Sequence, residues 1–256
     1  MMSVFKLFGR RRVGKEMRVR SRSESAHAVR PSTVRIDFLA PEPERLIASL
    51  AAFKLEGFEY LTRVLADIDD LDEQAHVAEL AQELYERHVQ LREAYESAAG
   101  RSFADTSIGQ FEARALWGRL QPALWQEAVL AAYLVDGIAV DFSKALGRGL
   151  RLRGGLRQTF GDRPEAKHAV AVLAAESERI PWMSDRLALW GRRVVGDSLL
   201  WCRSLMVLSD PVLRALRDTS LHRDEEVQQV ISQIEAVHGD LIAAHTARME
   251  SLGLTA

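Results

Sequence analysis

This 256-residue chain contains a single cysteine, Cys202, and no long uninterrupted apolar run. One cysteine excludes an internal disulfide and any metal cluster built from several thiolates, and it is typical of a protein in a reducing cytosol. The longest apolar run, Ala128–Val135, ends at Asp136, well short of the roughly 18 residues that a membrane-spanning helix needs. No signal peptide is expected, because no apolar segment of adequate length precedes a small-residue cleavage site. We therefore expect a cytoplasmic protein.

Several common catalytic motifs are also missing. No Gly-x-x-x-x-Gly-Lys loop follows a strand, so a phosphate-binding loop is excluded, and the glycine-rich stretch 147–155 is predicted to be a linker. No serine lies in a strand–turn–helix elbow of the kind that hydrolases use. No segment shows the alternation of apolar and polar residues that is typical of strands. These absences favour an all-α protein without nucleotide-hydrolysing or serine-hydrolase chemistry.

Charge is distributed unevenly along the chain. Residues 1–31 contain nine Lys and Arg against two Glu, a net charge of +7, whereas the whole chain has a net charge of -2, so the remainder carries -9. Low apolar content predicts that residues 1–31 form a basic, disordered arm. Such an arm suits two anionic partners, either tRNA or another nucleic acid, or an anionic membrane surface. A solvated tail without a partner is the third interpretation.

Helical periodicity accounts for nearly all of the chain after residue 41. Apolar residues recur every three or four positions, and prolines, glycines and aspartates separate the segments. Helices are predicted over residues 42–68, 72–98, 108–120, 124–146, 163–180, 185–208, 211–219 and 223–252. The predicted architecture is an all-α bundle of four or more long helices.

The segment 124–146 is the one that the other helices are expected to surround. On a helical wheel its polar side chains fall in one narrow arc, predicted to face water: Gln126, Glu127, Asp141 and Lys144. Asp136 lies outside that arc, among apolar side chains, so we expect a buried carboxylate. Because an isolated buried carboxylate is very costly, Asp136 must meet a cation, a metal ion or a proton.

A cation from another helix is the first way to neutralise Asp136. Lys54 lies on the apolar face of its predicted helix, and Arg192 and Arg193 lie within the apolar run of residues 187–200. Either an ammonium or a guanidinium in contact with Asp136 would make a metal unnecessary. Residue chemistry alone favours this ion pair over a metal.

A metal site is the second way. Helical bundles that hold two metals use Glu from two helices and Glu-x-x-His from two others. Two literal matches occur, Glu73–His76 and Glu235–His238. Random placement in a chain of this composition already gives about half a match, so both are interpreted as incidental. A more central set takes one residue from each of four predicted helices: Glu56, His88, Asp136 and Glu176.

Two further side chains are interpreted as parts of the core. Cys202 lies in an apolar stretch, which predicts an unreactive thiol and not a nucleophile. His245 shares a helix face with Leu241 and Met249, which is most simply explained by packing.

Three segments together resemble a known family: Asp136-Gly-Ile-Ala-Val-Asp-Phe142, residues 187–199 (LALWGRRVVGDSL) and residues 243–254 (AAHTARMESLGL). They are similar to a bacterial, largely actinobacterial family of the ferritin-like superfamily, described as similar to the MiaE tRNA hydroxylase. The resemblance covers about residues 42–254 and implies a ferritin-like four-helix bundle with additional C-terminal helices.

The resemblance also implies a chemistry. Active relatives carry a non-haem di-iron centre that activates O₂ to hydroxylate a modified adenosine of tRNA. By position, Glu56, Asp136 and Glu176 correspond to carboxylate ligands and His88 to a nitrogen ligand. Tyr85 stands where the family pairs a glutamate with that histidine. Two alternatives therefore stay open: a di-iron, O₂-dependent hydroxylase, or a bundle with an eroded, metal-free site that binds a partner.

Overall fold

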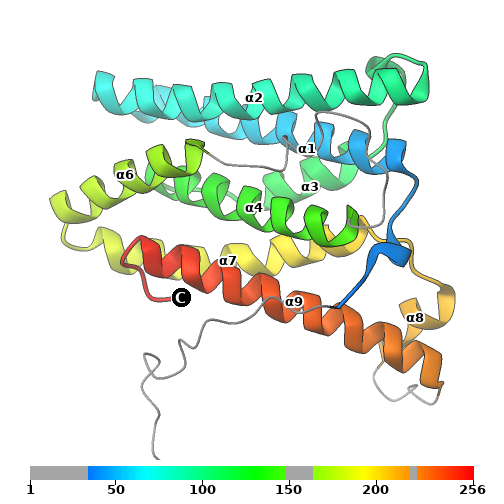
Figure 1. Cartoon of the computed structure of the whole chain (residues 1–256). Coiled ribbons are helices and arrows are strands. Elements are labelled where there is room, and N and C mark those ends of the chain that lie inside the picture. Colours follow the sequence, from blue (N-terminus) through cyan, green and yellow to red (C-terminus); the bar gives the residue numbers. More distant parts are fainter. Residues whose placement is uncertain (1–33, 148–163, 219–223) are drawn as a thin grey trace, which may run out of the picture. The chain divides into compact units, whose positions relative to one another are not determined.

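The computed structural model describes residues 34–147, 164–218 and 224–256. The predicted basic arm, residues 1–31, and most of the predicted linker at 147–155 lie outside the described residues. The described residues form eight α-helices and no strand, which confirms the predicted all-α class (Figure 1). The helices are α1 (Pro43–Val64), α2 (Leu71–Ala99), α3 (Gln110–Arg119), α4 (Trp125–Leu146), α6 (Pro164–Arg179), α7 (Met183–Ser204), α8 (Asp210–Ala215) and α9 (Glu225–Ser251).

Helix ends follow local signals that are visible in the sequence. At the start of α2 the Asp70 side chain accepts hydrogen bonds from the backbone N–H groups of Asp72 and Glu73, at 2.9 and 3.0 Å. Its last turn is closed by Gly100, whose φ of 64° lies in the left-handed region that favours glycine. These caps explain why the observed helix differs from its predicted range by only one residue at each end.

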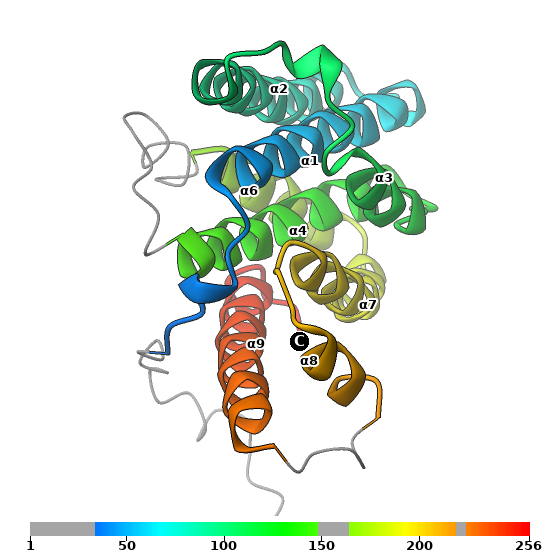
Figure 2. The ribbon, with the colours of Figure 1, turned by 90° about the vertical axis from the view of Figure 1, so that its right-hand side faces the viewer.

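Four helices form the central bundle. α1 packs against α2, α2 against α6, α6 against α4, and α4 against α1 (Figure 1). α7 and α9 pack against the outer side of α4, and α3 packs against α1 and α7 (Figure 2). α4 therefore has neighbours on nearly every side, and most of its residues are buried, as its apolar sequence predicts.

A close approach between helices attaches α3 to α1. The Trp117 indole N–H of α3 donates to the carbonyl oxygen of Phe53 at 3.1 Å. The ring fits because Gly57 has no side chain: a Cβ atom at that position would lie 2.9 Å from the Trp117 ring.

In the described ranges no helix combines the length and apolar content needed to cross a bilayer.

Candidate functional site

The centre of the bundle contains the ion pair between α1 and α4. Asp136 is 1% exposed and Lys54 is 5% exposed, so the expected burial of Asp136 is confirmed. The Lys54 ammonium donates to Asp136 Oδ1. A buried carboxylate is tolerated in this way because the ammonium supplies both the opposite charge and a hydrogen bond.

Arg192 and Arg193, the other two cations predicted as possible partners of Asp136, lie elsewhere, so the prediction is wrong for these two residues. Arg192 is exposed on α7 and donates to the Thr255 hydroxyl at 2.9 Å. Arg193 is also exposed, with its guanidinium 5.1 Å from the centre of the Trp190 ring. Both guanidinium groups are directed outward because the apolar run of α7 buries only one stripe of that helix. Lys54 alone of the three candidates has an observed contact with Asp136.

His88 of α2 is buried in the same bundle, as its periodicity predicts, with 4% of its surface exposed. Its Nδ1 lies 2.8 Å from the Ala51 carbonyl oxygen of α1. A carbonyl only accepts, so Nδ1 carries the proton and the lone pair of the neutral ring is on Nε2. Burial lowers the pKa of His88, which keeps the ring neutral. Its polar contact is thus with backbone of the neighbouring helix.

Glu56 of α1 is held on the side that faces α3. Its carboxylate is buried, and it accepts a hydrogen bond from Arg114 Nε at 3.0 Å. Arg114 itself is largely exposed, so its guanidinium approaches the Glu56 carboxylate from outside the four-helix bundle. Glu56 therefore pairs with a surface arginine and not with Asp136 or His88.

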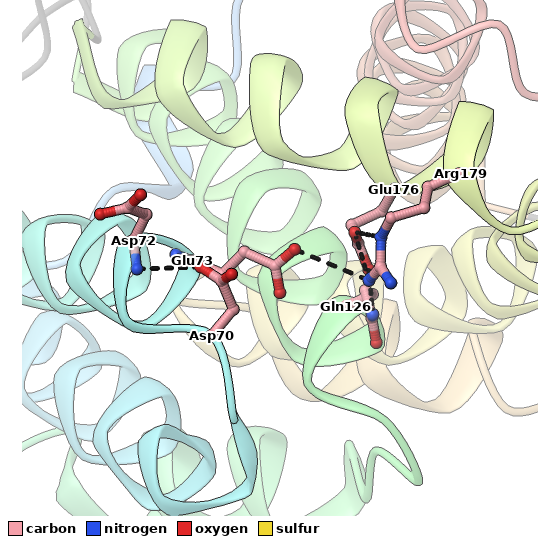
Figure 3. Close-up of polar contacts among 6 residues, drawn as sticks. All are labelled: Asp70, Asp72, Glu73, Gln126, Glu176 and Arg179. Carbon is pink, nitrogen blue, oxygen red and sulfur yellow. Dashed lines mark hydrogen bonds and ion pairs between the residues drawn. The ribbon is translucent and has the colours of Figure 1, made fainter.

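Glu176 of α6 belongs to a polar cluster at one end of the bundle, where α2 and α4 begin and α6 ends. Gln126 of α4 donates to Glu176 Oε2, and Arg179 donates to both Glu176 oxygens at 2.8 Å (Figure 3). Arg179 also lies 3.6 Å from a Glu73 oxygen of α2. Partial burial and the negative charge of Glu176 raise the pKa of Glu73. We call Glu73, Gln126, Glu176 and Arg179 the end cluster.

Two residues of α4 that the helical wheel predicts to face water are buried, so the prediction is wrong at these positions. Gln126 and Glu127 are 5% and 4% exposed. Glu127 accepts from the Ala123 and Leu124 backbone N–H groups and from Arg186 Nε at 2.7 Å. Both side chains are buried because α6 and α7 cover the start of α4, which a wheel of one helix does not show. Glu127 is thus satisfied by neighbouring groups instead of water, and the Gln126 side-chain amide donates to Glu176.

The four candidate metal ligands thus lie in different places and have different partners. Asp136 pairs with Lys54, Glu56 with Arg114, Glu176 with Gln126 and Arg179, and His88 with a carbonyl. Across the described ranges no group of three or more His, Cys, Asp or Glu side chains is arranged to hold a metal ion. The donor set therefore does not fit a di-iron centre in this geometry.

Sequence reasoning missed the end cluster. Its one local signal is the spacing of three residues between Glu176 and Arg179, which places them on one helix face. The approach of Glu73 and Gln126 depends on how α2 and α4 meet α6, and no sequence pattern encodes that contact.

The core interpretation of Cys202 is confirmed, because the thiol is fully buried and burial raises its pKa.

Comparison with known families agrees with the fold. Residues 44–213, about two thirds of the chain, match a family described as the ferritin-like domain of actinomycetes. The match begins at α1 and ends within α8, so it includes the whole four-helix bundle and leaves out α9. Curated proteins give no match. The chain belongs to this family of actinomycete ferritin-like domains.

Proposed function

We propose that this chain is a binding module built on a ferritin-like bundle, related to the di-iron tRNA hydroxylases but with its metal site eroded. One observation carries the proposal: the Lys54 ammonium contacts Asp136 in the middle of the bundle. It supplies the positive charge that a metal ion would otherwise bring to this carboxylate.

The ammonium also works against metal binding. A dication about 4 Å from a lysine ammonium is repelled by roughly 8 kcal/mol at an effective dielectric constant of about 20. The other candidate ligands do not compensate for that repulsion, because Glu56 and Glu176 each pair with an arginine. A metal would have to displace three protein cations from three carboxylates before it was bound.

The proposed partner is a phosphate-bearing polymer or surface that binds to residues 1–31. The arm carries +7 and the remainder of the chain -9, so phosphate groups are attracted to the arm and repelled from the helical part. tRNA or another nucleic acid and an anionic membrane offer the same phosphate chemistry. On this proposal the bundle is a rigid carrier and the arm makes the contacts.

Binding assays on the full chain test this function. Replacing Arg10, Arg11 and Arg12 with serine should lower the salt dependence of RNA binding by about two units of log K per log [salt], since each phosphate contact to a single strand contributes about 0.7. Serine at the exposed arginines Arg193, Arg214 and Arg217 is the matched control and should leave the slope unchanged. Binding to tRNA and not to phosphatidylserine vesicles identifies a nucleic acid partner, and the reverse identifies a membrane. Binding to neither contradicts the proposal.

A di-iron, O₂-dependent hydroxylase acting on tRNA is the second candidate function. It is supported by the ferritin-like fold and by the burial of Glu56, His88, Asp136 and Glu176, all of which are 6% exposed or less. In that case the three carboxylates and His88 would move away from their present partners to hold iron. Oxygen uptake that requires both Fe(II) and tRNA, and that is lost in Asp136→Asn, would support the hydroxylase over the binding module.

A further inference from the structure

A cleft of about 280 Å³ lies between α2 and α6. Its lining comes from the first turns of α2 and from one face of α6: Asp72, Glu73, His76, His168, Ala171, Val172, Ala175 and Glu176. Neither Lys54 nor Asp136, the ion pair at the centre of the bundle, lines this cleft. Its volume is near the lower end of the range for small-molecule sites.

The cleft exists because α6 presents small side chains to α2. Ala171 and Ala175 are one helical turn apart and lie on the same face of α6, with Val172 beside them. Methyl groups at these positions leave open the space that longer side chains would fill. One wall of the cleft is therefore aliphatic.

The other end of the cleft is acidic. The Glu73 side chain extends toward Glu176 and Arg179 there (Figure 3), and Asp72 also lines the cleft. Arg179 contacts Glu176 at 2.7 Å but lies 3.6 Å from Glu73, and its side chain is 59% exposed. With the imidazoles counted as neutral, three carboxylates and one guanidinium leave a formal charge of -2.

Glu73 is less well compensated than Glu176, because Arg179 lies farther from Glu73 than from Glu176. Its side chain is 27% exposed, and its pKa is raised by partial burial and by the neighbouring Glu176 charge. An added cation in the cleft would relieve this repulsion, and an N–H donor would give Glu73 a charge-assisted hydrogen bond. A ligand that also carries a short hydrocarbon chain would cover the alanine wall.

We propose that the α2–α6 cleft binds a small protonated aliphatic amine, with its ammonium on Glu73 and Glu176 and its hydrocarbon chain along Ala171, Val172 and Ala175. The donor set of the cleft selects an organic cation over a metal ion, because no described group of three ligating side chains converges. This site does not include the Lys54–Asp136 pair.

An NMR titration of the full chain with n-pentylamine tests the site, and 1-pentanol is the control ligand of the same length without the charge. Saturable shifts of His76 and His168 in the millimolar range are expected with the amine, and none with the alcohol. Glu73→Gln should weaken amine binding about tenfold, because it removes a charge-assisted hydrogen bond. Ala175→Leu fills the cleft and should abolish binding.

Two matched variants on α2 keep the test specific. Glu79→Gln and Ala78→Leu are made at exposed positions that do not line the cleft, and both should bind the amine as the unaltered chain does. Equal binding of pentanol and pentylamine would overturn the charge argument. Loss of binding in the control variants, absence of saturable binding, or tight binding of Zn²⁺ that displaces the amine would overturn the proposal.

Discussion

Removing one member of the buried ion pair should strongly destabilise the bundle. Lys54→Met keeps most of the side-chain volume but removes the ammonium, and it leaves Asp136 charged in a site where 2% of its side chain is exposed. Breaking a buried pair from one side typically costs about 3–5 kcal/mol. For a chain of this size the loss corresponds to a fall in Tm of roughly 10 °C.

A double-mutant cycle separates the ion pair from simple packing. Asp136→Leu alone buries an ammonium without this carboxylate, so it should cost a similar amount of stability. The double variant Lys54→Met/Asp136→Leu has neither charge and should unfold within about 1 kcal/mol of the unaltered chain, because a well-packed apolar pair often replaces a buried ion pair without loss. The two single effects should therefore add up to far more than the double effect.

Urea denaturation followed by circular dichroism measures the four free energies of unfolding. Two controls calibrate the cycle. Arg63→Met removes an exposed pair with Glu59, whose side chains are 61% and 44% exposed, and should change stability by less than about 1 kcal/mol. Arg192→Met, also at an exposed position, should be similarly mild. The reasoning is refuted if Lys54→Met is as mild as these controls, or if the double variant loses the sum of both single effects.

Three further predictions follow from buried groups. His245 is 3% exposed, and burial lowers its pKa to about 4, whereas its pKa in the unfolded chain is near the ordinary 6.5. Because the unfolded chain therefore binds more protons between these values, the free energy of unfolding should fall by up to about 3 kcal/mol as the pH drops from 6.5 to 4. His245→Leu should make the free energy of unfolding depend less on pH over this range. An unchanged slope would contradict this. Cys202 should react with a thiol reagent only at the rate of unfolding, and rapid labelling of the native chain would disprove its burial. Gly57→Ala should lower the free energy of unfolding by about 1–3 kcal/mol because its Cβ would meet the Trp117 ring, and a neutral result would show that α3 can shift.

The sequence predicts helices well in this chain because their ends are marked locally. The segment predicted at 124–146 is observed at Trp125–Leu146, and its wheel correctly places Asp136 in the core. The same wheel wrongly exposes Gln126 and Glu127. Periodicity describes one helix at a time, whereas the burial of the start of α4 is produced by α6 and α7.

The choice among cations shows the same limit. Lys54 and Arg192 both lie in apolar runs of sequence, and only the packing of α1 and α7 around α4 shows which one contacts Asp136. Glu73 is the clearest miss. Its spacing from His76 is interpreted as incidental to metal binding, yet the fold brings Glu73 next to Glu176, which lies about 100 residues away in sequence on another helix.

The central claim is that a lysine, and not a metal, neutralises the carboxylate in the middle of this bundle. Anaerobic loading of the purified full chain with excess Fe(II), followed by gel filtration and metal analysis, tests it most directly. The account predicts iron far below one atom per chain, with no difference between the unaltered protein and Asp136→Asn. Retention of about two irons per chain, lost in Asp136→Asn, would contradict it.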